Sequence, residues 1–492
     1  MKDIGLISIL TTVYNGYEFL DECAQSIFLQ GTDIEWWIGI NGHGADGGEA
    51  FVKACQIRAT YGPSVHVVNL DTCRGRVESL NTLATYVKGD WVAILDCDDT
   101  WKPRKLCRQI EYILDTVEPI DCVGTFCSYI GDVSGIVPPL PYHHITEAQV
   151  MAINPIINSS ALFRRKWAFW EDRFGLEDYD LWIRMIRRGA TLHVIPEVLV
   201  HHRIHGNSFF NRGGKQDVEG LRTFYRVPPL RHTTTVVSCY YPIHSKYPPE
   251  MYMDWIVQFW PTLSCPLIFF TEPYLVSMFE DIFKGRPGPT KVIGIPIINL
   301  RAFQKLSHSV WRDTHALDPE RATHTPELYA LWYEKKEFVL RAIEWNPFYS
   351  EKFVWCDAGI CRRPEWASIA ARFPVEERIP RGAVLLLQID PLRSDDFLPQ
   401  ADGICGDFST RATVGGGIIA SDRSGWISWS VAYDAMLLRY HLAGRFIGKD
   451  QNIMASVLIK HPELVVGIQR NAELGPIYSW FSSLFFLAGF GT

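Results

Sequence analysis

Long hydrophobic runs are scarce in this sequence of 492 residues. The apolar stretch 476–492 is short and interrupted, although it carries Trp480, Phe481 and Phe490, so it does not predict a membrane-spanning helix. We expect a core helix there, with contact to a membrane surface as the lesser alternative. No secretory leader precedes the first predicted strand, which favours a cytoplasmic protein.

An excess of basic residues and paired cysteine motifs are missing as well. The chain has 48 Lys and Arg against 55 Asp and Glu, a net charge of −7, so we expect no nucleic-acid partner. Its 12 cysteines form no C-x₂-C pair, and we expect reduced core cysteines rather than a zinc ribbon. A hydrophobic content of 47% indicates a globular chain, long enough for two domains or one with large insertions.

The most informative stretch is a short hydrophobic segment followed by acids. Residues 91–95 are five consecutive apolar residues, which predict a strand buried on both faces, and Asp96, Asp98 and Asp99 follow directly. So much negative charge at the end of a buried strand is costly unless a cation shares it. Carboxylate oxygens at this density suit Mg²⁺ or Mn²⁺. The plain alternative is an acidic surface turn.

Strands and helices alternate through the first part of the chain. We predict strands at 6–10, 36–40, 65–70 and 91–95, with a helix at 17–30 and another that carries Val77, Leu80 and Ala84 on one face. This order predicts a right-handed, parallel α/β sheet. Ligands bind beyond the carboxyl ends of such strands, so the turns at 11–15, 41–46 and 96–99 are expected to form a nucleotide-binding rim.

The acidic segment also fits a second phosphate chemistry. Residues 96–100 spell D-x-D-x-T, the signature of haloacid-dehalogenase-type phosphatases. That signature belongs to the first strand of its domain, whereas three strand-helix units come before it here. This order counts strongly against a phosphatase.

A further group of acids begins the predicted helix near residue 177. Glu177, Asp178 and Asp180 stand in its first turn, where the positive end of the helix favours negative charge. One such acid is usually a helix cap. Three exceed what a cap requires.

Together these segments resemble the family 2 glycosyltransferases of the GT-A fold, over residues 1–212. The matching stretches are T-T-V-Y-N-G, K-G-D-W-V-A-I-L-D-C-D-D, N-S-S-A-L-F-R-R, E-D-Y-D-L-W-I-R and H-R-I-H-G-N-S. The resemblance implies that Asp96, Asp98 and Asp99 bind a nucleotide-sugar donor and a divalent metal, joined by His205. It makes Asp178 the catalytic base of an inverting transfer. Thr12, Tyr14 and Asn15 would line the nucleotide pocket, and Asn41 stands where an Asp usually faces the pyrimidine, as an amide that can still bond a uracil edge.

The alternation of strands and helices begins again after a glycine-rich break at 211–217. We predict strands at 234–240, 267–271, 292–298 and 353–356, and helices at 251–260, 328–345 and 426–442. The glycine run 415–417 precedes an apolar segment. Asp357 follows a strand and Asp450 opens a helix, so the acid positions of the first half recur, although a capping Asp explains Asp450 as readily from spacing alone.

The second half resembles the HtrL/YibB family of proposed glycosyltransferases. The matching stretches are K-K-E-F-V-L-R-A-I-E-W-N-P-F, F-V-W-C-D-A-G-I-C-R and G-K-D-Q-N-I. The resemblance implies that Asp357 holds metal and diphosphate, and that catalytic Asp450 with Gln451 faces the donor sugar or the acceptor. Lys335 or Lys336 could neutralise the diphosphate instead of a metal.

We therefore predict two GT-A-like α/β domains in tandem, at 1–212 and 231–492, joined by a linker at 213–230. The predicted function is a bifunctional, Mn²⁺- or Mg²⁺-dependent glycosyltransferase that uses nucleotide-sugar donors, UDP-sugars first, and glycan acceptors. One enzymatic alternative is a single active transferase with a degenerate second domain. The binding alternative is a lectin-like pair of domains that holds sugars without transfer.

Overall fold

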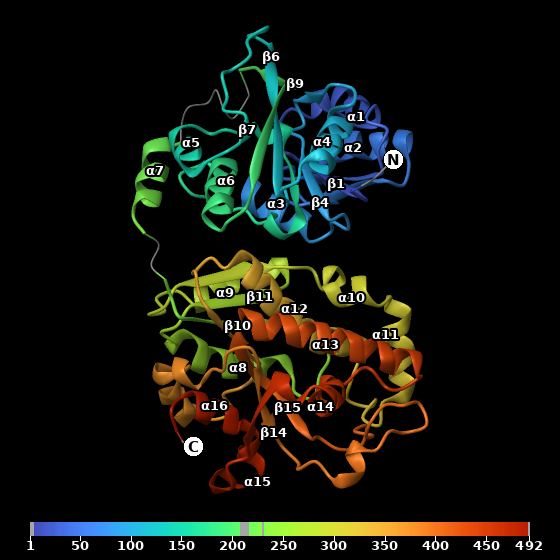
Figure 1. Cartoon of the computed structure of the whole chain (residues 1–492), viewed down its shortest axis with the longest axis vertical. Coiled ribbons are helices and arrows are strands. Elements are labelled where there is room, and N and C mark those ends of the chain that lie inside the picture. Colours follow the sequence, from blue (N-terminus) through green and yellow to red (C-terminus); the bar gives the residue numbers. More distant parts are fainter. Residues whose placement is uncertain (1–3, 207–215, 229–230, 491–492) are drawn as a thin grey trace. The chain divides into compact units, whose positions relative to one another are not determined.

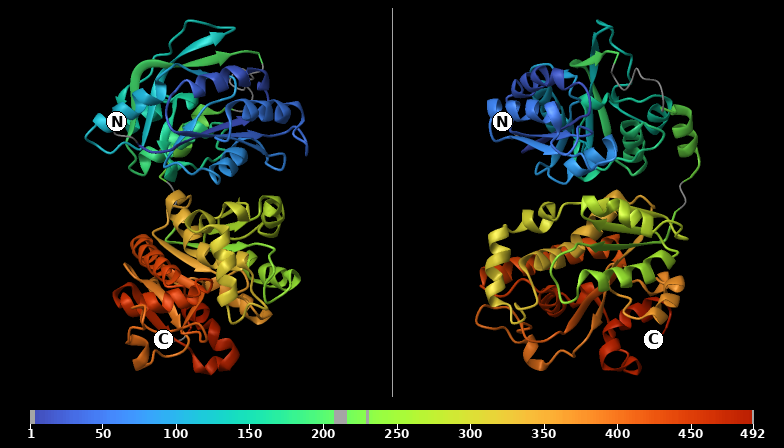
Figure 2. Two further views of the ribbon diagram at one scale, coloured as in Figure 1. Left: turned by 90° about the vertical axis from the view of Figure 1, so that its right-hand side faces the viewer. Right: turned by 180° about the vertical axis from the view of Figure 1, so that it is seen from behind.

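The computed structural model of the chain describes residues 4–206, 216–228 and 231–490 (Figure 1). The chain divides into two compact units, a first unit of Met1–Pro228 and a second unit of Pro229–Thr492. Each unit has its own sheet, in which most paired residues join parallel strands, with helices packed around it (Figure 2). The predicted α/β fold class, with two mostly parallel sheets in tandem, is confirmed.

The first unit is built from alternating strands and helices. Its strands are β1 (Ile7–Val13), β2 (Ile34–Ile40), β3 (Val65–Asn69), β4 (Trp91–Ile94), β5 (Thr100–Trp101), β6 (Cys122–Gly131), β7 (His143–His144), β8 (Leu162–Arg164) and β9 (Leu192–Ile204). Its helices are α1 (Leu20–Phe28), α2 (Gly48–Tyr61), α3 (Arg76–Ala84), α4 (Lys105–Asp115), α5 (Glu147–Ala152), α6 (Glu177–Arg187) and α7 (Val218–Arg226).

The first sheet has the strand order β3-β2-β1-β4-β8-β6-β9-β5, and β7 pairs with β9. Strands β1 to β4 are parallel, β8 runs antiparallel between β4 and β6, and β6 is parallel to β9. Along β4, Trp91 and Ala93 pack into the hydrophobic cluster on one face, whereas Val92 and Ile94 pack into the cluster on the other. This strand is therefore buried on both faces, as its continuous apolar sequence predicts.

The second unit repeats this alternation. Its strands are β10 (Thr234–Tyr240), β11 (Leu267–Thr271), β12 (Thr290–Gly294), β13 (Lys352–Cys356), β14 (Val384–Gln388), β15 (Val414–Asp422) and β16 (Val465–Gln469). Its helices are α8 (Pro249–Phe259), α9 (Val276–Ile282), α10 (Arg301–Lys305), α11 (His308–Thr314), α12 (Pro326–Trp345), α13 (Arg423–Leu442), α14 (Asp450–Lys460), α15 (Gly475–Tyr478) and α16 (Ser482–Leu487).

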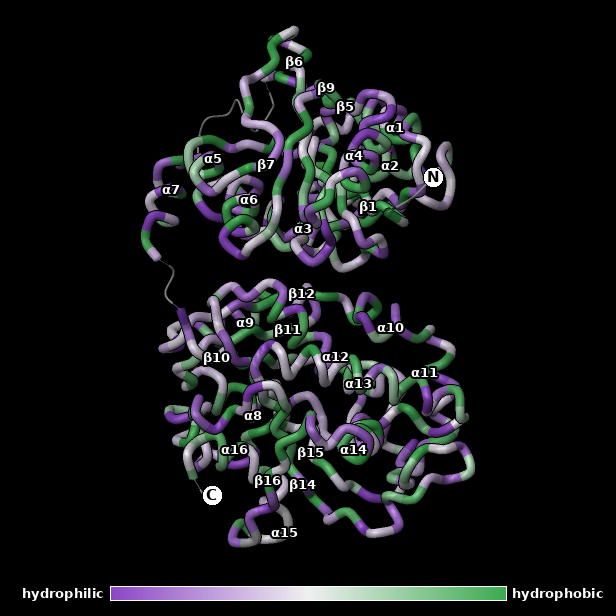
Figure 3. Tube along the Cα trace, viewed as in Figure 1, coloured by the Kyte–Doolittle hydropathy of each residue, from purple (hydrophilic) through white to green (hydrophobic). Residues whose placement is uncertain are grey.

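The two sheets share one topology. The second sheet has the order β12-β11-β10-β13-β15-β14-β16, in which β10 to β13 are parallel, β15 runs antiparallel between β13 and β14, and β14 is parallel to β16. Strand β13 thus occupies the place of β4. Helix α14 precedes the parallel strand β16 as helix α6 precedes β9. In Figure 3, hydrophobic residues concentrate on the sheets, for example along β1 and β15.

The range 213–230, predicted as a linker, contains helix α7. Its residues Leu221 and Tyr225 are buried in the first unit, and the Tyr225 hydroxyl donates a hydrogen bond to Asp180 of α6 (2.6 Å). Residues 207–215 and 229–230 lie outside the described part of the chain.

The apolar C-terminal stretch folds back onto the second unit. Leu484, Leu487 and Ala488 are fully buried in its hydrophobic core. This corrects the alternative of an apolar tail held ready for a membrane, because the stretch packs into the second unit, although Trp480 and Phe490 remain 42% and 43% exposed. Among the described residues, no helix combines the length and the hydrophobicity needed to cross a membrane.

Candidate active site

The first site is built where β1, β2 and β4 end. The Thr11 hydroxyl of β1 donates to the Leu95 carbonyl after β4 (2.7 Å), and the Cys97 thiol donates to the Asn15 carbonyl (3.2 Å). The backbone N–H of Asn41, after β2, donates to the backbone carbonyl of Val13 at the end of β1 (2.9 Å). The three polar turns therefore meet at one edge of the sheet.

Asp96 is joined to the beginning of α6 through an arginine. Arg76, the first residue of α3, places Nη2 2.5 Å from Asp96 Oδ1 and Nε 2.8 Å from Glu177 Oε1. The Asn158 amide also donates to Asp96 (3.2 Å). Burial raises the pKa of Glu177 to about 7, with the charge of Asp178 adding to the rise and Arg76 opposing it. Arg76 thus fixes the distance between the acidic turn after β4 and the acidic turn of α6.

Asp98 lies beside the carboxyl end of β9. Its Oδ2 is 2.9 Å from Nε2 of His205, one of the predicted metal ligands. Burial raises the pKa of Asp98 to about 6, and the neighbouring charges of Asp99 and Asp96 add to the rise. The carboxylate is therefore crowded by negative charge, which is the condition that a bound cation relieves.

Asp99 differs from its neighbours because its carboxylate is fully buried. Its Oδ2 accepts a hydrogen bond from Ser159 (2.5 Å) and lies 3.0 Å from His202 Nδ1, while Oδ1 accepts from the Arg203 backbone N–H (2.8 Å). Asp99 ties the acidic turn to β9. This structural use of both oxygens differs from the metal role predicted for the residue.

Asp178 stands in the first turn of α6. Its Oδ1 accepts from the Tyr179 backbone N–H (2.7 Å), and its Oδ2 accepts from the Asn154 amide (3.1 Å). Burial raises the pKa of Asp178, and these two hydrogen bonds and Arg76 only partly offset the effect. Sequence reasoning expected the helix end to favour the ionised form; burial acts in the opposite direction.

The predicted nucleotide residues separate into two groups. Thr12 is half-buried at the end of β1, and Tyr14 and Asn15 are exposed after it. Asn41 is buried, and its amide hydrogens are donated to the carbonyls of Leu70 (2.7 Å) and Cys73 (2.8 Å). Asn41 therefore holds the turn after β3, so its NH₂ group is already used within the protein.

The second unit places a lysine among its predicted site residues. Lys335 Nζ of α12 lies 3.2 Å from Asp357 Oδ1, directly after β13, and 3.0 Å from Asp450 Oδ2 in the first turn of α14. Asp450 Oδ1 accepts from the next backbone N–H, that of Gln451 (2.8 Å), as Asp178 does from Tyr179. Burial opposes the charge on Lys335, but Asp357 and Asp450 together raise its pKa. The Gln451 side chain is half-buried on the same turn.

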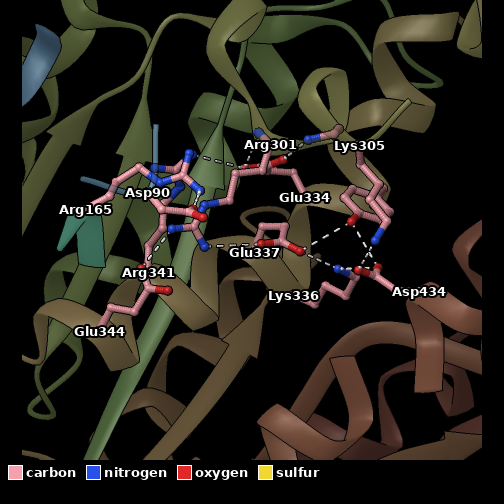
Figure 4. A network of polar contacts seen from close by, with 12 residues as sticks. Asp90, Arg165, Arg301, Lys305, Glu334, Lys336, Glu337, Arg341, Glu344 and Asp434 are labelled. Atoms are coloured by element: carbon pink, nitrogen blue, oxygen red, sulfur yellow. Dashed lines mark hydrogen bonds and ion pairs between the residues drawn. The ribbon is translucent and has the colours of Figure 1, made fainter. Parts of the chain in front are cut away.

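Lys336 lies apart from this site. Its ammonium pairs with Glu337 and with Asp434 Oδ1 (2.8 Å), and the Tyr333 hydroxyl also donates to Asp434 (3.0 Å). Figure 4 shows Lys336, Glu337 and Asp434 in a larger charged network with Arg301, Glu334 and Arg341. The adjacent lysines of α12 thus serve different clusters, and only Lys335 reaches the acid after β13.

Comparison with known proteins identifies part of the chain. Residues 8–169 match the protein family described as Glycosyl transferase family 2.

Residues 8–169 of the first unit are thus similar to the family 2 glycosyltransferases.

Individual relatives agree with the glycosyltransferase assignment. An uncharacterized glycosyltransferase of Haemophilus influenzae is 26% identical over 225 residues, 42% of this chain and 68% of the relative. The O-antigen biosynthesis glycosyltransferase WbnJ of Escherichia coli is 26% identical over 220 residues, 42% of this chain and 83% of its own. Among solved structures, S. aureus TarS with UDP-GlcNAc has 12% identity and a TM-score of 0.36, covering 42% of this chain and 61% of TarS, a likeness too slight to bear on function. The protein is an enzyme of the glycosyltransferase class.

The donor atoms in the first unit show whether a divalent ion could bind there. Two ligands at right angles, each about 2.1 Å from one ion, lie about 3 Å apart, and Asp98 Oδ2 and His205 Nε2 are 2.9 Å apart. An ion of this kind takes one or two protein carboxylates and completes its shell with water and substrate phosphate. The described residues contain no group of three or more His, Cys, Asp or Glu arranged as a metal site. The same 2.9 Å is the length of a hydrogen bond between the two side chains, so Asp98 and His205 are two candidate donors, and water and substrate phosphate would have to complete the shell.

Sequence reasoning gave no role to several side chains that organise the glycosyltransferase domain. Arg76 bridges two acidic turns, Asn154 holds Asp178, and Ser159 holds Asp99. The only available signal was position, because Arg76 begins a helix after the third strand and the other two lie in the segment before β8. The partners of these side chains are distant in sequence and become visible only in the fold.

Proposed function

We propose that the chain is a bifunctional glycosyltransferase in which each unit transfers a sugar from a nucleotide-sugar donor. One observation carries the proposal: both units place a carboxylate directly after the strand at the fourth position of the shared topology, and a second carboxylate in the first turn of a later helix. In the first unit Arg76 connects the two positions, and in the second unit Lys335 does. Tethering two transferases would raise the concentration of one product near the next site, which favours successive linkages in one glycan.

In the first unit the proposed reaction is a direct displacement with inversion. The bond between the anomeric carbon and the donor diphosphate breaks, and its electron pair stays on the diphosphate oxygen. The acceptor oxygen bonds to the anomeric carbon and gives its proton to Asp178, the base. Asn154 and the Tyr179 N–H orient that carboxylate.

Binding of the donor is assigned to the other residues at the same edge. Asp98 and His205 would hold Mn²⁺ or Mg²⁺, which when bound supplies positive charge for the diphosphate. Thr12, Tyr14 and Asn15 would line the base and ribose pocket, with UDP as the first candidate. Asn41 is left out of the pocket because its NH₂ group bonds to backbone carbonyls.

The acceptor is proposed to be a hydroxyl of a growing glycan. The relative WbnJ is named for O-antigen biosynthesis, and O-antigens are polysaccharides. For the second unit the proposal rests on the repeated geometry and on the resemblance to the HtrL/YibB family. Asp450 would act there as the base and Gln451 would face the donor sugar or the acceptor.

A donor panel tests the proposal. The whole chain is screened against UDP-, GDP- and dTDP-sugars by thermal shift, with and without Mn²⁺, and release of nucleoside diphosphate is then measured. We expect at least one donor to stabilise the chain and to be slowly hydrolysed without acceptor. Asp98→Asn should remove the Mn²⁺-dependent part of the stabilisation. Stabilisation by free sugars with no donor turnover would instead establish the lectin-like alternative.

A further inference from the structure

We propose that the second site binds its donor without a divalent metal, because the ammonium of Lys335 occupies the position between its carboxylates that a metal would need. This inference rests on the proposed function of the second unit and specifies its cofactor requirement. It departs from the role predicted for Asp357, that of metal ligand. The metal that the fold leads one to expect does not fit the residues found in this site.

The position of Lys335 is fixed by three different acceptors. Its Nζ lies 3.2 Å from Asp357 Oδ1, 3.0 Å from Asp450 Oδ2 and 3.0 Å from the Gly416 carbonyl oxygen. The ammonium donates hydrogen bonds to the Gly416 carbonyl and, at 3.5 Å, to Asp357 Oδ2, and it forms an ion pair with Asp450. The Lys335 side chain is 10% exposed and that of Asp450 is 7% exposed. Lys335 is therefore a buried residue of the site and not a surface lysine.

Strand β15 closes the remaining side. The Gly417 carbonyl accepts from the Asp357 backbone N–H (2.8 Å), which holds the acidic turn against the strand. A Cβ at Gly416 would lie 2.6 Å from Asp450 Oδ2, so the backbone passes this carboxylate at a distance that only glycine allows. Lys335 therefore lies between the two carboxylates and the glycine strand, in contact with all three.

The two sites also differ in the charged groups that surround their acids. The first site gathers Asp96, Asp98 and Asp99, and Asp98 is crowded by like charge. The second site has one acid after its strand and a buried cation that contacts it. A divalent ion added there would be repelled by Lys335 and would have to displace it from both carboxylates. In the first site Arg76 pairs with Asp96 and Glu177, whereas Asp98 contacts His205. In the second site Lys335 contacts both carboxylates, Asp357 and Asp450.

Lys335 can also provide the charge that the leaving group needs. Its longest contacts are those to Asp357, at 3.2 and 3.5 Å, and Asp357 is the most exposed member at 40%. Asp357 keeps a separate hydrogen bond from the Trp355 indole N–H (2.8 Å). An entering diphosphate oxygen can therefore take over the hydrogen that Lys335 shares with Asp357. When the acceptor oxygen bonds to the anomeric carbon, the bond from that carbon to the diphosphate breaks. Its electron pair remains on an oxygen beside Lys335, and the acceptor hydroxyl passes its proton to Asp450.

The first test measures nucleotide binding to the second site alone. In the full chain carrying Asp98→Asn, the metal-dependent site is disabled, and UDP and GDP are titrated by calorimetry in EDTA and in Mn²⁺. We expect one nucleotide to bind with the same affinity, within about twofold, in both buffers. Binding that appears only with Mn²⁺ would overturn the metal-free site. Binding of neither nucleotide in either buffer would instead contradict the proposed function of the second unit.

The second test removes the ammonium group. Lys335→Met should weaken metal-free nucleotide binding by about tenfold or more, because a charge-assisted contact to phosphate is lost, whereas Lys335→Arg should retain most of it. Lys336→Met is the matched control, since it removes the next lysine of α12, equally buried but in a different cluster. Equal losses in both Met variants would show that the effect is structural and would overturn the role of Lys335.

Mn²⁺ binding gives a readout that is independent of nucleotide. Titration followed by electron paramagnetic resonance should show no Mn²⁺ site in the Asp98→Asn chain. Adding Lys335→Met to that chain should create one, because it leaves Asp357 and Asp450 without their cation. A second-unit Mn²⁺ site already present before Lys335 is removed would contradict the proposal.

Discussion

At the end of β4, the three carboxylates differ in what surrounds each of them. Asp96 is paired with Arg76, Asp98 lies beside His205, and Asp99 is fully buried among Ser159, His202 and Arg203. The residues lie within four positions of the sequence, yet one pairs with the arginine that also contacts Glu177, one lies beside a histidine and one anchors β9. A cluster of acids is therefore assigned residue by residue, from its partners, and not as a unit.

The burial of Asp178 leads to a prediction about pH. A general base works only when it is deprotonated, and burial raises the pKa of this carboxyl above its ordinary value of 3.8. We expect kcat/KM of the first transfer to fall on its acid side with a midpoint above that value, measured from pH 4 to pH 8 with saturating metal. Asp178→Asn should lower transfer by roughly 10²- to 10⁴-fold and remove this limb. An acid limb that is unchanged in the Asn variant would assign the titration to another group.

At the scale of elements, α7 is held to α6 by a buried charged cluster. The Asp180 carboxylate is fully buried and contacts Arg184 Nε (2.6 Å), Arg173 Nε (3.5 Å) and the Tyr225 hydroxyl (2.6 Å). Asp180 is two residues from Asp178 on the same helix. The last helix of the first unit is therefore fixed to the helix that carries the proposed base.

Removal of one hydroxyl tests this attachment. Tyr225→Phe deletes a hydrogen bond to a buried charge, which is worth about 2 kcal/mol, or roughly 30-fold in an opening equilibrium. We expect amide hydrogen exchange in α7 to accelerate by about that factor when α7 opens by itself. Tyr142→Phe, at a tyrosine that is 54% exposed, is the control and should leave exchange unchanged. Equal exchange in both variants would show that apolar packing alone holds α7.

The glycine run of the second unit shows where prediction from sequence stops. The strands at 234–240 and 267–271 were predicted with the bounds that β10 and β11 have, because both segments are rich in β-branched and aromatic residues. The strand predicted at 292–298 ends at Gly294 as β12, since Pro296 follows. Glycines 415–417 were expected to precede an apolar segment, but they lie inside β15, where Asp450 approaches the backbone. Such an approach between distant segments leaves no local pattern.

That approach predicts the effect of a small side chain at Gly416. Gly416→Ala would place a methyl group 2.6 Å from Asp450 Oδ2 and 3.0 Å from Met454, so the carboxylate must move. We expect loss of donor binding at the second site and a destabilisation of about 1–3 kcal/mol, measured by calorimetry and urea unfolding. Gly467→Ala in β16 is the matched control, because its methyl group meets nothing within 4 Å. Unchanged donor binding in Gly416→Ala would mean that the Asp450 carboxylate has no part in the site.

Local sequence patterns predicted the acids of the two sites better than the side chains that contact those acids. Asp98 and His205 lie together, as do Asp357, Asp450 and Lys335, and all of these residues stood out in the sequence by type and position. Lys336 is in another cluster because adjacent residues of a helix point about 100° apart. Arg76 was missed because an arginine at a helix start is common, and its bridging role depends on two segments that only the fold brings near.

At the scale of the whole molecule, the chain repeats one topology. Both sheets order their strands in the same way, and both carry acids after the fourth-position strand and in the first turn of the helix before the last parallel strand. The family match covers residues 8–169 of the first unit. The function proposed for the second unit therefore rests on the repeat and on its own site, where Lys335 contacts Asp357 and Asp450.

The most direct measurement disables each site in turn in the full chain. Asp178→Asn and Asp450→Asn are assayed separately and as a mixture, following nucleoside diphosphate release from UDP-, GDP- and dTDP-sugars with a glycan acceptor. Two independent catalysts predict that each variant loses one transfer and keeps the other, and that the mixture restores the complete product because the intermediate can diffuse between chains. Loss of all donor turnover in either single variant would contradict separate sites, and full activity of Asp450→Asn would leave the first unit as the sole catalyst.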